Sequence, residues 1–286
     1  MIIVDMHQVL ISNLMAQMAR VTYNGTKKGE ASKEMVRHMV CNSLRGYIRK
    51  FGNEYGKDLV LACDSANPWR REFFPQYKSN RRKNREEDNK DWDSIFEVLN
   101  QIKNEIKEFL PYKVVETYGA EADDVIATLC KHYQSEKIMI VSGDKDFIQL
   151  QKYENVRQYS PITKKHVNGV DAVVYIKEHI LKGDKSDGIP NVLSPDHTFT
   201  DDLRQRPLTS KKMKSILAQD IDDLNDELKR NYQRNEKLIN LDNVPEKLEG
   251  NILDDFKSAT CGDRSKLLDY FIDKRLKSLT EQIGEF

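Results

Sequence analysis

Short runs of Val, Ile and Leu recur along the first half of this chain, and each is followed at once or within three residues by an acidic residue. The runs are 2–4, 59–63 and 138–141, and the acids that follow them are Asp5, Asp64 and Asp144. Apolar runs of this length are typical of strands buried on both faces of a parallel sheet. Since ligands bind beyond the carboxyl ends of such strands, we expect these acids to meet at one edge.

Helical patterns separate these runs. The clearest is 92–110, where apolar residues recur at spacings of three and four. Further helices are expected near 8–20, 32–51, 121–133 and 146–151, and a fourth strand at 112–116. This alternation predicts an α/β fold, a mostly parallel sheet with helices on both faces. Beyond about residue 170 the strand signals end, so we expect an α/β domain over 1–169 and a helical region over 170–286, with a turn cluster at 183–196.

The charges balance overall but are unevenly distributed. The chain has 46 Lys and Arg and 46 Asp and Glu, so its net charge of +0 gives no indication of binding to nucleic acid. Seven cations and one acid lie within 70–85, and five cations without an acid lie within 204–214. An acidic site flanked by basic surfaces suits a polyanionic substrate.

The cysteines show no pattern of a zinc site. Cys41, Cys63, Cys130 and Cys261 are far apart, and we expect buried free thiols in a reducing compartment. The N-terminus enters a predicted strand at once, without a signal-peptide pattern, and no apolar run reaches transmembrane length. We therefore expect a cytoplasmic protein that does not associate with a membrane.

Nine acidic residues stand where strands end, where helices begin or in the turn cluster. Acids at helix starts also occur as caps that complement the helix dipole, and each motif alone is evenly balanced between capping and ligation. Because converging carboxylates cannot all stay ionised without a cation, the whole set predicts a site for Mg²⁺ or Mn²⁺. The candidate metal ligands are Asp5, Asp64, Glu121, Asp123, Asp124, Asp144, Asp146, Asp184 and Asp187.

The segment 69–83 mixes aromatic and basic residues. A solvated or disordered surface segment would have the same composition. However, Tyr77 can stack on a base, and Lys78 and Arg81 can share one helical face. From Ser79 to Lys90 there is no apolar residue, so we expect this part to be mobile when free and ordered by nucleic acid.

Six motifs, in this order and spacing, resemble the flap endonuclease / 5′-nuclease family. They are Val4-Asp5, Cys63-Asp64, the segment 73–81, Glu121-Ala-Asp123-Asp124, Ser142-Gly-Asp144-Lys-Asp146 and the segment 183–190. The ribonuclease H type of T-even-type bacteriophages is the nearest branch, and that likeness continues to the C-terminus. The resemblance implies a parallel sheet with a helical arch (about 70–92) over the active site. It also implies a helix-turn-helix element that grips duplex phosphates.

The resemblance further implies roles for single residues. Asp5, Asp64, Asp123 and Asp144 would hold the tighter of two metal ions, with Glu121 close by. Asp146, Asp184 and Asp187 would serve the second ion, partly through waters, and Asp124 is assigned to neither. Lys78 and Arg81 would contact the scissile phosphate as catalytic residues. The expected nucleic-acid-binding residues are Arg70, Arg71, Tyr77, Arg82, Lys83, Lys185, Arg204, Arg206, Lys211 and Lys212.

The function that the resemblance implies is a divalent-metal-dependent 5′→3′ nuclease with ribonuclease H or flap endonuclease activity. It would remove RNA primers and adjacent DNA during phage lagging-strand replication, in the cytoplasm of the bacterial host. Its substrates would be DNA and RNA·DNA duplexes with a 5′ end or flap. The enzyme would act as a monomer, with a single-strand-binding protein as a partner suggested by the resemblance alone.

Two other functions stay open. A PIN-type ribonuclease shares the sheet and the acid cluster, but it is expected to lack the segments 73–85 and 183–190, which this chain has. A catalytically silent DNA-structure binder would keep the fold, but it would gain nothing from repulsive carboxylates beside phosphates. The sequence ranks neither flap cutting against exonuclease action nor RNA against DNA.

Overall fold

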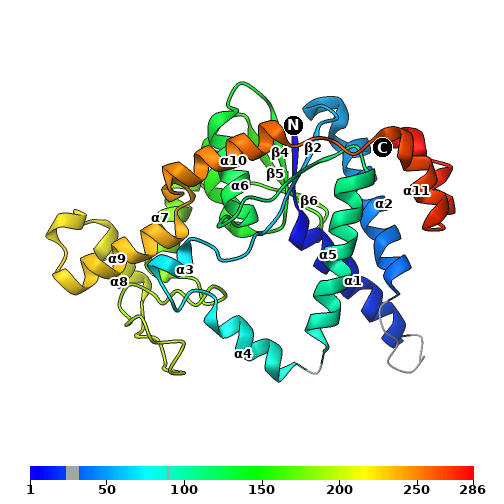
Figure 1. Ribbon diagram of the computed structural model, residues 1–286. Coiled ribbons are helices and arrows are strands. Elements are labelled where there is room, and N and C mark those ends of the chain that lie inside the picture. Colours follow the sequence, from blue (N-terminus) through cyan, green and yellow to red (C-terminus); the bar gives the residue numbers. More distant parts are fainter. Residues whose placement is uncertain (24–31, 89) are drawn as a thin grey trace.

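Figure 1 shows a computed structural model of the protein, which describes residues 1–23, 32–88 and 90–286. The side chains of residues 19–23, 82–84 and 86 lie outside that description. A six-stranded sheet in the order β3-β2-β1-β4-β5-β6 forms the centre of the molecule. Its strands are β1 (Ile2–Asp5), β2 (Leu59–Ala62), β3 (Lys113–Val115), β4 (Ile138–Val141), β5 (Val156–Ser160) and β6 (Lys165–Val167).

Five strands run parallel, and β6 is antiparallel to β5. The α/β fold with a mostly parallel sheet is therefore confirmed. Strands β5 and β6 were not predicted, because polar residues interrupt both and leave no apolar run. The register pairs Asp5 with Ala62 and Val4 with Val141. As a result β1, β2 and β4 end side by side, and we call this the carboxyl edge.

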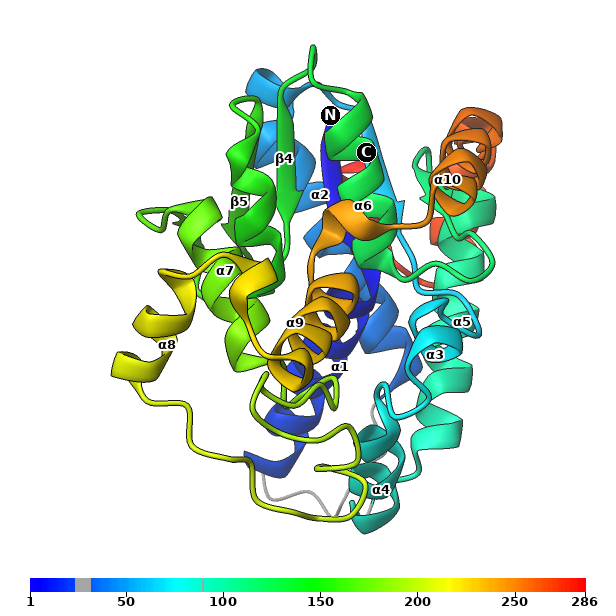
Figure 2. The same ribbon diagram turned by 90° about the vertical axis from the view of Figure 1, so that its left-hand side faces the viewer.

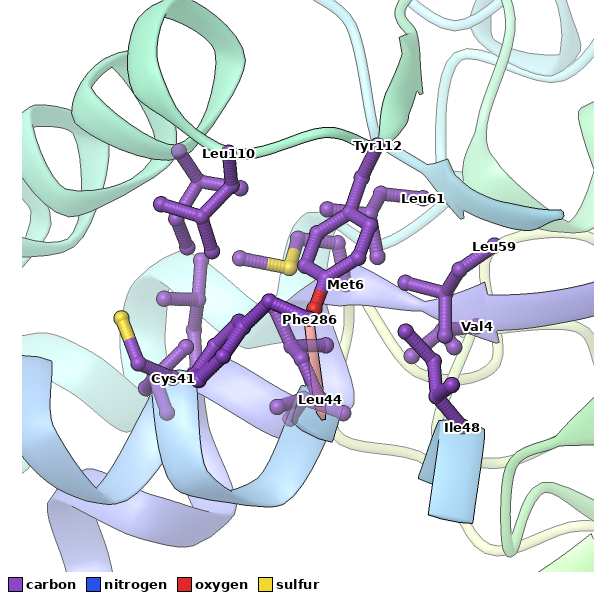
Figure 3. Packing of buried hydrophobic residues seen from close by; sticks show 14 of the residues in the cluster. Val4, Met6, Cys41, Leu44, Ile48, Leu59, Leu61, Leu110, Tyr112 and Phe286 are labelled. Atoms are coloured by element: carbon purple, nitrogen blue, oxygen red, sulfur yellow. The ribbon is translucent and has the colours of Figure 1, made fainter. Parts of the chain in front are cut away.

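Alternate residues of the central strands face two apolar clusters on the two sides of the sheet. One side is covered by α1 (Met6–Tyr23), α2 (Lys33–Tyr55), α5 (Trp92–Phe109) and α11 (Leu267–Asp273). Figure 3 shows Tyr112 and Phe286 among the buried side chains of this cluster. The other side is covered by α6 (Ala122–His132), the 3₁₀ helix η1 (Lys145–Lys152) and α10 (Glu246–Ser258). The sheet is thus sandwiched between helices, which fixes the carboxyl edge rigidly.

The part beyond residue 170 is helical, as expected. It comprises α7 (Ala172–Lys182), α8 (Ser210–Leu217), α9 (Asp226–Ile239), α10, α11 and α12 (Lys277–Thr280), with short 3₁₀ turns between them. Helices α7, α8 and α9 share a small apolar cluster of their own. Helices α10 and α11 pack instead on the sheet domain (Figure 1). The division at residues 169 and 170 stays a prediction.

Two helices lie within the expected arch, α3 (Arg70–Phe73) and α4 (Ser79–Glu87). In Figures 1 and 2, α4 stands away from the sheet on the side of the carboxyl edge and leads into α5. Lys78, the residue directly before α4, is its N-cap and has a left-handed conformation with φ of 56°. The expected mobility of this segment without nucleic acid stays a prediction.

One cysteine differs from expectation. Cys41, Cys63 and Cys130 are buried free thiols, but Cys261 is exposed. The backbone N–H of the adjacent Gly262 donates to the Leu110 carbonyl at 2.9 Å. This bond holds the loop against the core, while the Cys261 side chain faces solvent. Within the described part of the chain, no helix has both the length and the apolar character to span a bilayer.

Candidate active site

Four acids surround the carboxyl edge. Asp5 is the last residue of β1, Asp64 follows β2 by two residues, and Asp144 follows β4 by three. Asp123 lies in the first turn of α6, the helix that covers this end of β1 and β2. The sequence therefore places these carboxylates together through parallel strands of equal length and one helix start.

Hydrogen bonds tie this edge together. Asp5 accepts from the Gln8 backbone N–H at 3.0 Å and from Ser142 Oγ at 3.1 Å. Asp64 accepts from the Ala122 backbone N–H at 2.9 Å, which fastens the loop after β2 to the start of α6. Asp5 and Asp64 are thus held in place by the protein before any ligand binds, as metal ligands are when hydrogen bonds from neighbouring groups orient them.

Electrostatics at this edge favour a bound cation. Burial raises the pKa of Asp5 to about 6, and the charges of Asp64 and Asp144 add to the rise. Burial and the charge of Asp144 raise the pKa of Asp123 well above its usual range. Asp5 is buried and Asp123 is half-buried, whereas Asp64 and Asp144 are exposed. Carboxylates that repel one another are relieved by a hard divalent cation with oxygen ligands. The donor set therefore fits such an ion.

Asp124 lies elsewhere, contrary to its prediction as a metal ligand. Its Oδ1 lies 2.8 Å from Arg70 Nη2, and its Oδ2 accepts from Arg70 Nη1 at 3.0 Å and from Trp69 Nε1 at 3.2 Å. The Glu121 backbone N–H also donates to Oδ2 at 2.9 Å, as in a capping box. Because both oxygens are committed to a buried ion pair and a helix cap, Asp124 is a structural residue.

Arg70 and Tyr77 also differ from their predicted role in nucleic-acid binding. Each is only 2% exposed. Arg70 Nε donates to the Leu238 carbonyl at 2.9 Å, and its Nη1 donates to Glu121 Oε2 at 3.0 Å. Tyr77 Oη lies 2.8 Å from Glu121 Oε2 and 2.9 Å from Asp187 Oδ2. A buried ring held in this way cannot stack on a base, so both side chains support the site from within.

Lys78 and Arg81 are the cations beside the acids. Lys78 Nζ donates to Glu121 Oε1 at 2.6 Å and lies 3.5 Å from Asp187 Oδ2. Arg81 Nη2 donates to Asp187 Oδ1 at 2.6 Å. Burial opposes the charge on Lys78, but Asp187 and Glu121 outweigh it and raise the pKa of the amine. Two fixed positive charges therefore stand next to the carboxylates.

The turn after α7 is shaped by glycine. Gly183 has φ of +67°, and a Cβ there would meet the Ile189 carbonyl oxygen at 2.4 Å, so only glycine allows this close approach. Asp184 Oδ1 accepts from the backbone N–H of Ser186 at 2.7 Å and of Asp187 at 3.2 Å. Asp184 therefore stabilises the turn that carries Asp187 toward the arch.

A second cluster combines two predicted acids with a histidine that the sequence did not single out. One ligand atom each of Asp146, His179 and Asp184 lies within 4.8 Å of the others. Burial and the charge of Asp144 raise the pKa of Asp146 to about 7. Burial opposes a charge on His179, but Asp184 and Asp146 outweigh it and raise the pKa of the ring. The spacing His179-x4-Asp184 on a helix that ends at the turn was the available signal.

Three supporting residues were also missed. Gln8 Oε1 accepts from the Gly143 N–H at 2.6 Å. Gln158 Nε2 donates to the carbonyls of Asp144 at 2.6 Å and Ser142 at 3.0 Å, and Ser142 Oγ accepts from the Asp144 N–H at 3.1 Å. Gln158 lies on β5, and only the fold brings it to the loop that carries Asp144.

The remaining basic candidates divide into two groups. The side chains of Arg82 and Lys83 lie outside the described residues. The exposed candidates are Arg71, Lys185, Arg204, Arg206, Lys211 and Lys212. Arg206 Nη1 pairs with Glu227 at 3.0 Å, an exposed contact that a phosphate can displace at small cost. Helix α8, which carries Lys211 and Lys212, lies at the outer end of the helical region (Figures 1 and 2).

Comparisons with known proteins cover the whole chain. Residues 1–179 match the family of the 5′-3′ exonuclease N-terminal resolvase-like domain, and residues 170–286 match the T4 RNase H C-terminal domain. The chain is 34% identical to the ribonuclease H of Enterobacteria phage T4 over 299 residues, which covers 99% of this chain and 95% of that protein. A 5′-3′ exonuclease of Buchnera aphidicola is 28% identical and covers 60% of each chain.

Solved structures agree with this assignment at the level of the fold. The flap endonuclease of bacteriophage T5, in a pseudo-enzyme–product complex with DNA and metal ions, superposes with a TM-score of 0.59 at 17% identity. The match covers 99% of this chain and 97% of that one. Together with the two domain matches, the chain therefore belongs to the 5′-3′ exonuclease family and carries a C-terminal domain of the T4 ribonuclease H type.

Proposed function

We propose that this protein is a Mg²⁺-dependent 5′→3′ nuclease that removes RNA primers and adjacent DNA during phage lagging-strand replication. The observation that carries the proposal is the meeting of Asp5, Asp123 and Asp144 at the carboxyl edge beside the charged amine of Lys78. The T4 relative is a ribonuclease H, and the T5 structure is a flap endonuclease with DNA and metal ions. Both names support the same reaction, hydrolysis of a phosphodiester.

Two metal positions are part of the proposal. Asp5, Asp64, Asp123 and Asp144 would hold the first, and Asp146 and Asp184 would hold the second. Divalent ions in such sites activate a water and stabilise the leaving oxygen of an in-line displacement. Asp187, which we expected at the second position, faces Lys78 and Arg81, so we assign it to positioning those cations.

Lys78 and Arg81 would neutralise the charge that builds on the scissile phosphate. Glu121 and Asp187 lie 2.6 and 3.5 Å from the Lys78 amine, and the Tyr77 hydroxyl lies 2.8 and 2.9 Å from the same two carboxylates. Preorganised charge of this kind is often the largest contribution to catalysis, because it needs no rearrangement during the reaction. A phosphate that enters would replace part of the carboxylate contacts of Lys78 and Arg81.

The substrate in this proposal is a DNA or RNA·DNA duplex with a 5′ end or flap. The exposed cations on α8 and in the turn, together with backbone N–H groups, would hold the duplex by sequence-independent phosphate contacts. A monomeric enzyme in the cytoplasm of the phage's host, with a single-strand-binding protein as partner, completes the proposal. These last points rest on the family resemblance.

A nicked duplex whose downstream strand begins with a 5′ RNA segment tests the proposal. We expect short 5′ products with Mg²⁺, none with EDTA, and none with Asp144→Asn, which should still bind the duplex. Asp269→Asn, an exposed change on α11, is the matched control and should cleave normally. A tight, salt-sensitive complex without products would indicate a silent binder. Cleavage of single-stranded RNA regardless of a 5′ end would indicate a PIN-type ribonuclease.

A further inference from the structure

We propose that His179 is a nitrogen ligand of the second metal position, together with Asp146 and Asp184, and that this position therefore prefers Mn²⁺ to Mg²⁺. The inference rests on the proposed function for the existence of that position, and it adds a ligand and a metal class. It concerns a residue that neither the acid motifs nor the resemblance singled out.

The geometry places the imidazole between the two carboxylates. His179 Nδ1 lies 3.3 Å from Asp146 Oδ1, and Nε2 lies 3.7 Å from Asp184 Oδ2. Ligand atoms of all three residues lie within 4.8 Å of one another. Atoms bound to one ion at about 2.1 Å are separated by roughly 3 to 4 Å. Small side-chain movements would therefore bring the three donors onto one ion.

The alternative is an imidazolium that merely bridges two acids. Against it, Nδ1 is buried and makes no hydrogen bond with any described atom, although Asp146 is near. The 3.7 Å separation at Nε2 is also beyond a normal hydrogen bond. The imidazole is thus close to both carboxylates but forms a well-aligned hydrogen bond with neither. This is the arrangement expected if the ring and the two carboxylates bind one cation.

The ring is fixed in this place by its surroundings. Tyr175 packs against His179 edge-on, with ring centroids 5.5 Å apart and planes at 82°. The side chain of His179 is only 14% exposed. Helix α7 also packs on η1, which carries Asp146. Since the position of the imidazole is set by packing, a nitrogen donor at this point is part of the built site.

The metal preference follows from ligand chemistry. Mg²⁺ is bound through oxygen and keeps several waters, whereas imidazole nitrogen suits later first-row metals. Mn²⁺ accepts carboxylate oxygens as ligands. It is also the first member of the series of first-row divalent metals whose affinity for sites with nitrogen ligands rises from manganese to copper. The first position has only carboxylate donors among its assigned residues, Asp5, Asp64, Asp123 and Asp144. The two positions should therefore differ in selectivity.

The chain offers a matched control. His7 Nδ1 lies 3.8 Å from Asp64 Oδ2, near the first position, but the His7 side chain is 49% exposed. The His7 imidazole thus lies near Asp64, but it is half exposed to solvent and not enclosed by carboxylates. The proposal assigns the nitrogen ligand to His179 and not to His7.

The test uses the full chain without DNA, loaded with Mn²⁺, and reads ¹⁴N modulation of the electron spin echo. We expect modulation from a bound histidine nitrogen in the wild type and in His7→Gln, and its loss in His179→Gln. Calorimetric titration should show one Mn²⁺ position weakened about tenfold or more in His179→Gln. Its Mg²⁺ affinity should change much less.

Labelling with ¹⁵N-histidine keeps the test decisive if His179→Gln does not fold. In labelled His7→Gln the ¹⁴N modulation should be replaced by that of ¹⁵N. Modulation that survives in a folded His179→Gln protein, or that is lost in His7→Gln, would overturn the proposal. An equal loss of Mg²⁺ and Mn²⁺ affinity would overturn the metal preference. Wild-type cleavage of the nicked duplex with Mg²⁺ reports on the proposed nuclease function separately.

Discussion

Arg81 Nη2 lies 2.6 Å from Asp187 Oδ1, so the base of the arch is tied to the turn that follows α7. Backbone contacts reinforce this link, because the Lys78 N–H donates to the Asp187 carbonyl at 2.8 Å. Asn80 Nδ2 also donates to the Lys185 carbonyl at 2.9 Å. Two segments more than a hundred residues apart, 78–81 and 184–187, are therefore joined beside the carboxyl edge.

Removing the Lys78 amine should impair the reaction more than binding. Lys78→Ala deletes the cation that contacts Glu121 and Asp187. We expect kcat to fall by about 10²- to 10³-fold, with a small change in duplex affinity, because the charge acts where the reacting phosphate would bind. Single-turnover cleavage and equilibrium binding measure the two effects. Lys185→Ala, an exposed change on the turn, should lower duplex affinity more than kcat. A loss of affinity alone in Lys78→Ala would make Lys78 a docking residue.

Two adjacent acids should behave differently when each is replaced by its amide. Asp124→Asn removes one charge of a buried pair with Arg70 and should lower the free energy of unfolding by about 3 kcal/mol or more. Asp123→Asn removes a half-buried carboxylate that its neighbours repel, so the metal-free protein should be as stable as the wild type or more stable.

Urea unfolding in EDTA measures both stabilities, and calorimetry measures metal binding. Asp123→Asn should lose affinity for the first metal ion, whereas a folded Asp124→Asn protein should keep it. If instead Asp124→Asn lost metal affinity and Asp123→Asn kept it, Asp124 would be a metal ligand and Asp123 would not.

The sheet and its acidic edge could be predicted because their signals are local. Each central strand is a run of apolar residues, and the acid follows within three positions, as at Asp5, Asp64 and Asp144. Strand β5 has the sequence VRQYS and no such run. It forms because it pairs with β4, and that partner is not visible in a local pattern. Gln158, which steadies the Asp144 loop, was missed for the same reason.

Side-chain roles that depend on a distant partner could not be predicted. Arg70 and Arg71 are adjacent cations in the same basic segment, yet Arg70 is buried against Asp124, 54 residues later, while Arg71 is exposed. Their local sequence does not separate them, because burial is decided by how α3 docks on the start of α6. For His179 the sequence offers only its spacing from Asp184, and its neighbour Asp146 is brought beside it by the fold.

The stability of the metal-free protein should fall as pH rises through the titration of Asp5. Folding raises the pKa of this carboxyl from 3.8 to about 6. Between these values the unfolded chain has released the proton that the folded protein still holds. The free energy of unfolding therefore decreases with rising pH, by up to roughly 3 kcal/mol for this group. Below about pH 4 both states are protonated and no penalty remains.

Asp5→Asn isolates this contribution from those of other groups. In EDTA, the stability of the variant relative to the wild type should increase between about pH 4 and 7, as measured by urea unfolding at each pH. Mg²⁺ should stabilise the wild type at pH 7 and close much of the gap. A difference that does not change with pH would mean that Asp5 is not desolvated as the structure shows.

The exposed cations of α8 should contribute affinity through phosphates alone. Lys211 and Lys212 are exposed in the first turn of α8. Each phosphate contact releases counterions and adds about 0.9 to the slope of log affinity against log salt. The double change Lys211→Ala with Lys212→Ala should therefore reduce the slope by about 2 and leave kcat at saturating substrate unchanged. Lys247 and Lys257, two exposed lysines of α10, provide the matched double-alanine control. If both doubles lower the slope equally, general charge and not α8 holds the duplex.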